Sequence, residues 1–369
     1  MKRTRPIRAR ARALAAAALL LLTFAAPSGA QQPGLPAEKI RQIEQLITSA
    51  MARQSIAGLS VAVVTDNQLR WSNGYGFADL ENFVPAKSAT VYRLGSLSKP
   101  VTAAAVMQLA EQGKLDLDAP VQKYCPAFPQ KQWTVTARQI LGHLSGIRHY
   151  KSDEEFNSTR YYPSVVEGLA LFKDDPLLFE PGTKYLYSTF GYSVLGCAVE
   201  GASGERFGDY VAAHVIKPGG MDHMRVDSIP DLIPNRAQGY RRAPDGTLRN
   251  SPLADNSYKV PGGGFVSTAE DLAKFYVAMQ TGKLLKRETV EQMWTRQHLR
   301  DGKETEYGLG WGIVTANGLR YVGHSGAQQR ISTTLQSVPE RGVAVAIMVN
   351  VEDIRLAPLA NQIIDVLLK

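Results

Sequence analysis

The sequence predicts an α/β protein of the α+β type, in which an antiparallel β-sheet is flanked by N- and C-terminal helices and carries a mostly helical inserted subdomain. Apolar residues recur at helical spacing near both ends of the 369-residue chain. Strand patterns with tight turns follow the first helix and precede the last. The region between them is rich in Pro, Tyr and charged residues and shows few strand patterns. Strands joined by tight turns pair antiparallel, and helices then cover the faces of the sheet.

The first thirty residues have the pattern of a cleavable secretory signal peptide. A basic start, MKRTRPIRAR, leads into an apolar run, and the small residues Ser28-Gly29-Ala30 stand before Gln31. The apolar part is shorter than the ~20 residues of a membrane-spanning helix, so we expect no stable membrane anchor after cleavage. The sequence therefore predicts a signal peptide over 1–30, one domain over 31–369, and an exported protein that is periplasmic or secreted.

The signal peptide also accounts for most of the positive charge. The whole chain carries a net charge of +8. Six basic residues and no acidic residue lie within 1–30, so the remainder carries +2; these residues are Lys2, Arg3, Arg5, Arg8, Arg10 and Arg12. Because no basic arm or aromatic-basic interleaving follows, we expect no nucleic-acid partner.

The first elements after the signal peptide are a helix and two strands. The stretch AEKIRQIEQLITSAMARQ (37–54) places six apolar residues on one helical face: Ile40, Ile43, Leu46, Ile47, Ala50 and Met51. The stretch GLSVAVVTDNQLRWSNGYG (58–76) predicts two strands joined by a turn at Asp66-Asn67. A second helix is expected to start in RLGSLSK (93–99) and to continue to about Gln112.

The later elements return to the sheet after the helical insertion. We expect the sheet subdomain to include about 37–115 and 261–369, and the helical subdomain about 116–260. Ser267-Thr268-Ala269-Glu270 reads as a capping box that opens another helix. Four strand patterns follow, in LGWGIV, LRYVGHS, RISTTLQSV and GVAVAIMVN. The final helix is predicted from its apolar stripe, which consists of Leu359, Ile363, Ile364 and Leu367.

Two cysteines, Cys125 and Cys197, are too few for a disulfide scaffold or a metal cluster. An oxidising compartment would permit them to pair. Cys197 lies in the apolar run VLGCAVEGASG, which favours a buried position on a helix. Whether the two cysteines pair stays open at the level of the sequence.

Three motifs point to chemistry that the rest of the sequence does not support. Gly323–Ala327 nearly spells the G-x-S-x-G elbow of α/β-hydrolases, but the fifth residue is Ala and no histidine follows His324. Gly262–Gly264 lacks the Lys-Ser/Thr of a phosphate loop, so a tight turn is expected there. His143 and His149 have no acidic or thiol companions at metal spacing. We expect neither a metal nor an organic cofactor.

The spacing of Ser96 and Lys99 indicates a nucleophile and its base. Residues three apart lie on the same face of a helix, one turn from each other. A lysine in the first turn opposes the helix dipole, and that field lowers its pKa in the direction that a base needs. The helix start also points the backbone N–H of Ser96 towards an oxyanion. The alternative interpretation is a serine cap beside a solvated lysine. Ser98 is not one turn from Lys99, so it is expected to be only a polar neighbour.

Two later segments support the first interpretation. Tyr187-Ser188-Thr189 precedes a predicted helix, and His324-Ser325-Gly326 lies on a predicted strand. Ser-x-x-Lys, Tyr-Ser-x and a basic-small-Gly triplet, in this order, resemble the serine β-lactamase and penicillin-binding protein superfamily. The resemblance covers nearly all of 31–369. It is closest to the class C-like branch, and YSTFGY and HLSGIRHY look most like the mitochondrial serine β-lactamase-like protease and its bacterial relatives.

The resemblance implies a β-lactamase-like catalytic domain that forms an acyl-enzyme. Ser96 would be the acylated nucleophile, Lys99 its base, and Tyr187 the residue that relays a proton to or from the leaving group and later helps to activate water. The oxyanion would lie between the backbone N–H groups of Ser96 and Ala327. Gly326 would leave room for substrate along the strand.

The resemblance also implies that Thr189, His324, Ser325 and Gly326 bind substrate, and two of these positions depart from the family pattern. Family β-lactamases usually have Asn at the position of Thr189, where it contacts the acyl side chain of the substrate. They usually have Lys at the position of His324, although some D,D-peptidases and esterases have His. A histidine is partly charged near neutral pH, so its contribution to binding a substrate carboxylate should fade as pH rises. Both departures favour a peptidase or esterase over an efficient β-lactamase.

Other functions stay open at this point. The chain could be a true class C-like β-lactamase or a D-Ala-D-Ala carboxypeptidase. A non-catalytic penicillin-recognising protein is disfavoured because Ser96, Lys99 and Tyr187 are all present. A filament-forming role is conceivable because the mitochondrial relative forms filaments. The expected partner is a small-molecule, ester or peptide substrate, and the oligomeric state is left open.

Overall fold

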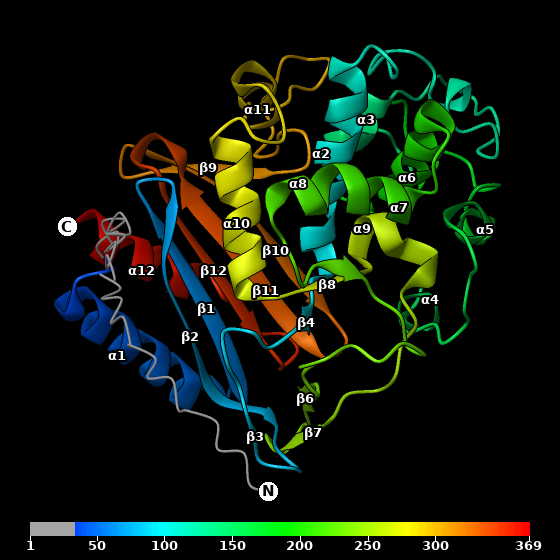
Figure 1. Cartoon of the computed structure of the whole chain (residues 1–369). Coiled ribbons are helices and arrows are strands. Elements are labelled where there is room, and N and C mark those ends of the chain that lie inside the picture. Colours follow the sequence, from blue (N-terminus) through cyan, green and yellow to red (C-terminus); the bar gives the residue numbers. More distant parts are fainter. Residues whose placement is uncertain (1–33) are drawn as a thin grey trace, which may run out of the picture. The chain divides into compact units, whose positions relative to one another are not determined.

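A seven-stranded antiparallel sheet runs through the structure, which is a computed structural model that describes residues 34–369 (Figure 1). Its strands lie in the order β3-β2-β1-β12-β11-β10-β9. The chain therefore builds one half of the sheet before the insertion and the other half after it. The bounds are β1 (Gly58–Thr65), β2 (Gln68–Asp79), β3 (Val84–Pro85), β9 (Gly312–Ala316), β10 (Leu319–Gln328), β11 (Ile331–Val338) and β12 (Val343–Val349). The predicted signal peptide over 1–30 lies outside the described residues.

Short strands and most of the helices make up the rest. The described α-helices are α1 (Ala37–Gln54), α2 (Ser98–Glu111), α3 (Ala137–Leu141), α4 (Asp153–Phe156), α5 (Val165–Gly168), α6 (Thr189–Ser203), α7 (Phe207–Val211), α8 (Lys217–Gly219), α9 (Val260–Gly263), α10 (Ala269–Gln280), α11 (Arg287–Met293) and α12 (Ala357–Leu368). A three-stranded sheet contains β4 (Tyr92–Arg93), β8 (Phe265–Ser267) and β5 (Arg225–Val226), and a hairpin contains β6 (Tyr240–Arg242) and β7 (Leu248–Asn250). The predicted fold class is confirmed.

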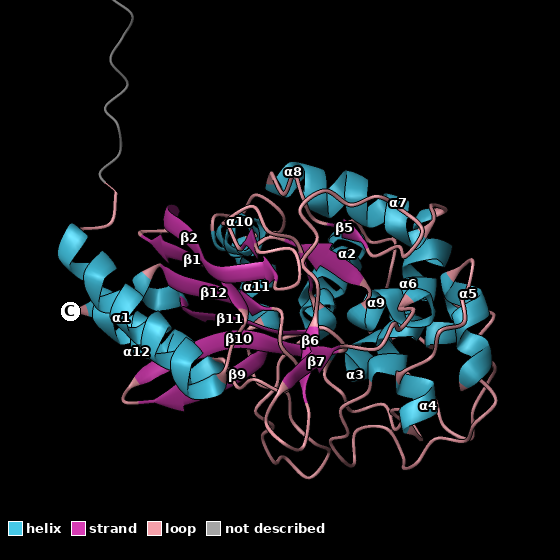
Figure 2. Cartoon of the chain, turned by 90° about the horizontal axis from the view of Figure 1, so that it is seen from below, coloured by secondary structure: helices cyan, strands magenta, loops and turns pink. Residues whose placement is uncertain are grey.

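The two faces of the sheet pack against different helices. Figure 2 shows α1 and α12 on one side of the strands and the larger helical layer on the other. On β1, Val61 and Val63 point into the cluster shared with α1 and α12, whereas Ala62 and Val64 point into the cluster shared with α2, α6 and α10. This alternation is the period of two that a strand buried on both faces requires. The sheet thus forms the middle layer between the terminal helices and the helical layer.

Two local predictions can be compared with the structure directly. Asp66 and Asn67 both adopt left-handed backbone angles between β1 and β2, with φ of 52° and 55°. This is the geometry of a two-residue hairpin turn, and it confirms the predicted turn. The capping box was predicted one residue too early. Thr268, not Ser267, caps α10, because its side chain accepts a hydrogen bond from the backbone N–H of Asp271.

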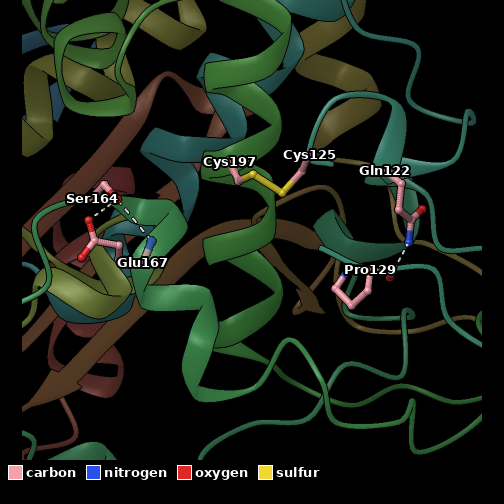
Figure 3. Close-up of a disulfide and its surroundings, with 6 residues drawn as sticks. All are labelled: Gln122, Cys125, Pro129, Ser164, Glu167 and Cys197. Carbon is pink, nitrogen blue, oxygen red and sulfur yellow. Dashed lines mark hydrogen bonds between the residues drawn. A yellow bond between two sulfur atoms is a disulfide. The ribbon is translucent and has the colours of Figure 1, made fainter. Parts of the chain in front are cut away.

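Cys125 and Cys197 form a disulfide with an S–S distance of 2.04 Å. Figure 3 shows the bond crossing from the helix that carries Cys197 to the neighbouring segment with Cys125. Cys197 is a buried residue of α6, as predicted. It is also paired with Cys125, which the sequence left open. The pairing depends on two segments that are 72 residues apart in sequence. Among residues 34–369, no helix is long and apolar enough to cross a membrane.

Candidate active site

Ser96 lies where a short 3₁₀ helix, Gly95–Leu97, runs into α2. Gly95 has a φ of +55°, and a Cβ built there would lie 3.1 Å from the backbone nitrogen of Ala327 and 3.3 Å from Gly326. A side chain at position 95 would therefore be strained and would press on β10. Glycine allows the turn before Ser96 to lie directly against the strand that carries Ala327.

Lys99 is buried in the first turn of α2. Every residue of this helix from Ser98 to Met107 is buried, because α2 packs against helices α6 and α9. The Lys99 Nζ lies 3.0 Å from the Ser96 Oγ, 3.1 Å from the Thr189 Oγ1 and 2.8 Å from the carbonyl oxygen of Gly262. The predicted pair on one helical face is therefore present at hydrogen-bonding distance.

The environment of Lys99 favours its neutral form. Burial lowers the pKa of Lys99 well below its ordinary value, and the positive charge of Lys259 lowers it further. None of the three contacts is a carboxylate, so nothing in them holds the charge on the amine. A neutral amine beside a serine hydroxyl can accept its proton.

Tyr187 and Thr189 reach the same point from the start of α6. Ser188 caps this helix, since its Oγ accepts a hydrogen bond from the N–H of Gly191. The Lys99 Nζ lies 4.7 Å from the centre of the Tyr187 ring. Burial raises the pKa of Tyr187, while an interaction with the Ser96 hydroxyl opposes that shift. The phenol therefore keeps its proton at neutral pH.

Gly326 brings β10 into contact with the segment before Ser96. A Cβ at position 326 would lie 2.0 Å from the carbonyl oxygen of Leu94 and 2.4 Å from the Thr333 Oγ1. The Thr333 hydroxyl itself donates to that carbonyl at 2.9 Å. The family resemblance implies that glycine at this position leaves room for substrate. Gly326 does line the cleft, and the structure adds a second reason for glycine there, which is the close approach of the chain's own backbone.

His324 departs from the expectation of a partly charged residue. Its Nε2 lies 2.8 Å from the Tyr307 hydroxyl and its Nδ1 lies 2.7 Å from the Ser325 carbonyl oxygen. Burial lowers the pKa of His324 to about 3. The predicted pH-dependent charge at this position is therefore wrong, because the ring is buried and both of its nitrogens have partners.

A cleft of about 580 Å³ opens over the nucleophile. Six of the predicted site residues line this cleft: Ser96, Tyr187, Thr189, Ser325, Gly326 and Ala327. Lys99 contacts Ser96 but is not among the lining residues, and neither is His324. The pairing of β9 with β10 ends at Gly323, so the following stretch of β10 borders the cleft instead of another strand of the described sheet.

Several residues that support this site do not stand out in the sequence. The Nδ1 atoms of His143 and His149 accept hydrogen bonds from the backbone N–H groups of Ser188 and Thr189, both at 3.2 Å. Burial lowers the pKa of His143 well below its ordinary value and that of His149 to about 4. The ring centre of His143 is 4.3 Å from that of Tyr187.

Both histidines therefore position the start of α6 as neutral rings. Their spacing in the sequence raises only the question of a metal site, and no group of three or more His, Cys, Asp or Glu residues in the described part of the chain could hold a metal ion. Their motif, HLSGIRHY, was the available signal. The Gly262 carbonyl was also missed, because the glycine triplet was interpreted only as a turn. It is fixed next to Lys99 by the neighbouring Pro261, whose carbonyl accepts a hydrogen bond from Thr102 at 2.6 Å.

Comparison with known proteins supports the family resemblance and the fold. The family model described as Beta-lactamase matches residues 43–368. The chain is 32% identical to the human mitochondrial serine beta-lactamase-like protein LACTB, over 92% of this chain and 82% of that protein. A solved structure of the octameric penicillin-binding protein homologue from Pyrococcus abyssi is 27% identical, with a TM-score of 0.78 over 89% of this chain and 77% of that one. A penicillin-binding protein from Bacillus halodurans is 26% identical, with a TM-score of 0.75 over 87% and 98%.

Proposed function

Since the chain belongs to the beta-lactamase family, we propose that it is an exported serine hydrolase that transfers acyl groups through an acyl-enzyme on Ser96, acting as a peptidase or esterase. The observation that carries this proposal is the 3.0 Å contact between the Lys99 Nζ and the Ser96 Oγ, made by a buried lysine with a lowered pKa. A reactive serine needs a base at this distance that is unprotonated at neutral pH.

In the acylation step, the Ser96 Oγ attacks the acyl carbon of the substrate while the Lys99 amine takes the hydroxyl proton. The carbonyl oxygen gains negative charge, which the N–H groups of Ser96 and Ala327 stabilise. The bond to the leaving group then breaks, and the Tyr187 hydroxyl donates its proton to that group. The Lys99 ammonium returns a proton to Tyr187, so the pair regains its starting state.

Deacylation uses the same three residues, but only Lys99 and Ser96 exchange the proton. A water molecule attacks the ester formed on Ser96, and Lys99 accepts its proton. When the ester bond breaks, the Ser96 oxygen takes that proton back. Tyr187 acts here as a hydrogen-bond donor, because burial keeps its phenol protonated. Each step requires only residues of this chain and water.

The pocket contacts support a peptidase or esterase over an efficient β-lactamase. The Thr189 hydroxyl accepts a hydrogen bond from Lys99 at 3.1 Å, and threonine has no amide with which to contact an acyl side chain as well. His324 is neutral and supplies no charge for a substrate carboxylate. The expected partner is an ester or peptide, with no nucleic acid involved.

Covalent labelling of the purified protein lacking residues 1–30 tests the proposal. A fluorophosphonate should label the wild type at one site and leave Ser96→Ala unlabelled. A panel of short esters, ordinary peptides, D-Ala-D-Ala peptides and nitrocefin then ranks the substrate classes by kcat/KM. We expect esters or peptides to rank first. Equal labelling of Ser96→Ala would contradict the acyl-enzyme, and a nitrocefin rate above all others would identify a β-lactamase instead.

Export is a separate part of the proposal and has its own test. The full-length chain expressed in a bacterial host should be recovered outside the cytoplasm with Gln31 as its first residue. A protein that keeps residues 1–30 in the cytoplasm would contradict export and leave the chemistry at Ser96 untouched.

A further inference from the structure

His143 follows helix α3 at a backbone position that usually belongs to glycine. Its N–H donates to the carbonyl oxygen of Ile140 at 3.1 Å, and the N–H of Leu144 donates to that of Gln139 at 2.7 Å. These two bonds form a Schellman motif, in which the first residue beyond the helix cap has left-handed backbone angles and is most often glycine. The φ of His143 is +61°. A residue with a side chain is strained in this conformation, so a histidine at this position needs another reason.

The imidazole of His143 adds a second cost. The residue is only 1% exposed. Its Nδ1 accepts a hydrogen bond from the N–H of Ser188 at 3.2 Å, so the neutral ring carries its proton on Nε2. Within residues 34–369, this Nε2 has no hydrogen-bond partner, and burying a donor without an acceptor is unfavourable. The bond to Ser188 alone does not require a ring, because asparagine tolerates left-handed angles and also carries an acceptor.

The feature that only the ring supplies is its contact with Tyr187. The two ring centres are 4.3 Å apart, and the planes are tilted by 42°. The other aromatic contacts of Tyr187 in the described part of the chain are longer, at 5.8 Å or more. His143 also contacts the buried rings of Tyr307 and Tyr192, at 4.7 Å and 5.4 Å. His143 therefore connects Tyr187 to side chains that are fixed by their own burial.

Tyr187 needs such a support because it lies at the border of the cleft. It lines the cleft and is only partly buried, so protein does not surround its ring. In the proposed reaction, its hydroxyl donates a proton to the leaving group. Proton donation requires hydrogen-bonding distance in the reacting complex, and a misplacement of about 1 Å can cost about 10²-fold in rate.

We propose that His143 is a positioning residue that holds Tyr187 in place to protonate the leaving group, and that this support equips the site for amides and alkyl esters. The inference rests on the proposed function of Ser96 and Tyr187, and it names the substrate class for that site. Amines and alkoxides are poor leaving groups unless they receive a proton, whereas p-nitrophenolate departs as a stable anion. The dependence of the rate on the leaving group therefore reports on His143.

The competing interpretation is that His143 only fills space in the aromatic cluster. Replacing a residue of that kind would lower stability and slow all substrates by the same factor. A residue that acts through the Tyr187 hydroxyl would instead slow substrates selectively, and its effect on selectivity would vanish once that hydroxyl is removed.

The test compares kcat/KM for p-nitrophenyl butyrate and ethyl butyrate. Both esters form the same acyl-enzyme, and kcat/KM covers only the steps up to departure of the leaving group. His143→Asn keeps an acceptor for Ser188 and tolerates the backbone angles, but it removes the ring. We expect it to lower kcat/KM about tenfold more for ethyl butyrate than for p-nitrophenyl butyrate. His143→Gly, which suits the Schellman motif, should show the same selective loss. His298→Asn is the matched control, because its side chain is 54% exposed and it does not line the cleft.

A double-variant cycle shows whether His143 acts through Tyr187. Tyr187→Phe should lose at least as much of the ethyl-to-nitrophenyl ratio as His143→Asn. The double variant His143→Asn/Tyr187→Phe should have the ratio of Tyr187→Phe alone. An unchanged ratio in both His143 variants, or losses of the ratio that multiply in the double variant, would overturn the proposal and leave a space-filling residue.

Crystal structures of wild type and His143→Asn separate this proposal from the chemistry at Ser96. We expect the Tyr187 hydroxyl in the variant to move by about 1 Å or to occupy more than one position. If the wild type hydrolyses neither ester through Ser96 but this displacement is present, the hydrolase proposal fails and the positioning role stands. A Tyr187 that keeps its wild-type position in His143→Asn overturns the positioning role.

Discussion

At the scale of single residues, the site is defined by a lysine whose three hydrogen-bond partners are all uncharged. The Lys99 Nζ contacts the Ser96 hydroxyl, the Thr189 hydroxyl and the Gly262 carbonyl within 3.1 Å. This arrangement fixes the position of the amine and leaves it without a counter-ion. The same residue type at the surface would be a solvated cation, and burial is what makes it a base.

Replacing Lys99 should therefore remove reactivity and keep the fold. Lys99→Met has a similar volume and suits a buried position, but it cannot accept a proton. The rate of labelling by a fluorophosphonate should fall by about 10²–10⁴-fold. Ser98→Ala serves as the control, since the Ser98 Oγ accepts a hydrogen bond from the N–H of Phe265 and Ser98 does not line the cleft. A Lys99→Met protein that is folded and labels at the wild-type rate would contradict the role of Lys99.

His149, which is partly buried, predicts how stability changes with pH. His149 is neutral when folded because its pKa is about 4, whereas the free side chain binds a proton near pH 6.5. Between these two values the unfolded state holds more protons, so stability falls as the pH decreases from 7 to 5. In His149→Asn, whose Oδ1 can replace the Nδ1 acceptor, this loss should be smaller by about 1 kcal/mol.

Urea unfolding at pH 7 and pH 5 measures this difference. His298→Asn is the matched control, because its side chain is 54% exposed and it does not line the cleft. An equal loss of stability in wild type and His149→Asn would show that His149 is not held neutral by the fold.

At the scale of elements, the site depends on how closely β10 approaches the start of α2. Gly326→Ala would place a Cβ 2.0 Å from the Leu94 carbonyl oxygen and force the strand away from it. The Ala327 N–H would then leave the predicted oxyanion position, and losing one such donor costs about 10²–10³-fold in rate. Gly312→Ala on the neighbouring β9 is the control, since its nearest contact would be 3.3 Å. Ester hydrolysis at the wild-type rate by Gly326→Ala would refute this account of the strand.

The disulfide is the covalent link between elements of the helical layer. It joins α6 to a segment 72 residues earlier, and closing a loop of this length restricts the unfolded chain. Cys125→Ala/Cys197→Ala should lower the free energy of unfolding by about 2–4 kcal/mol. Neither cysteine lines the cleft, so labelling of Ser96 should persist at 25 °C. Wild-type protein treated with a reductant should match the double variant, and two titratable thiols in untreated protein would contradict the bond.

At the scale of the whole molecule, the sequence predicted the parts whose periodicity is local. The helical face of 37–54, the hairpin at Asp66-Asn67 and the four C-terminal strand patterns all correspond to elements of the structure. Each is determined by the spacing of apolar residues within one segment. Ser96 and Lys99 could be paired for the same reason, because one helical turn separates them.

The remaining features depend on segments that meet only after folding. Three residues illustrate this, and they come from parts of the chain without a strand pattern or a strong helical period: His143, Lys259 and Tyr307. In the structure, His143 packs beside Tyr187, Lys259 lines the cleft and Tyr307 contacts His324. None of these positions follows from the sequence pattern. The error over His324 has the same origin. The residue type suggested a charge near neutral pH, and only burial and the Tyr307 contact show that the ring is neutral.

Mass spectrometry of the intact protein during turnover tests the central claim most directly. The protein is mixed with a slowly hydrolysed ester and quenched in acid within seconds. We expect a species heavier than the free enzyme by the mass of the acyl group, located on the peptide that contains Ser96, and its disappearance as substrate is exhausted. Ser96→Ala should show no such species. Hydrolysis by the wild type without any acyl adduct, or an adduct on another residue, would contradict a mechanism through Ser96.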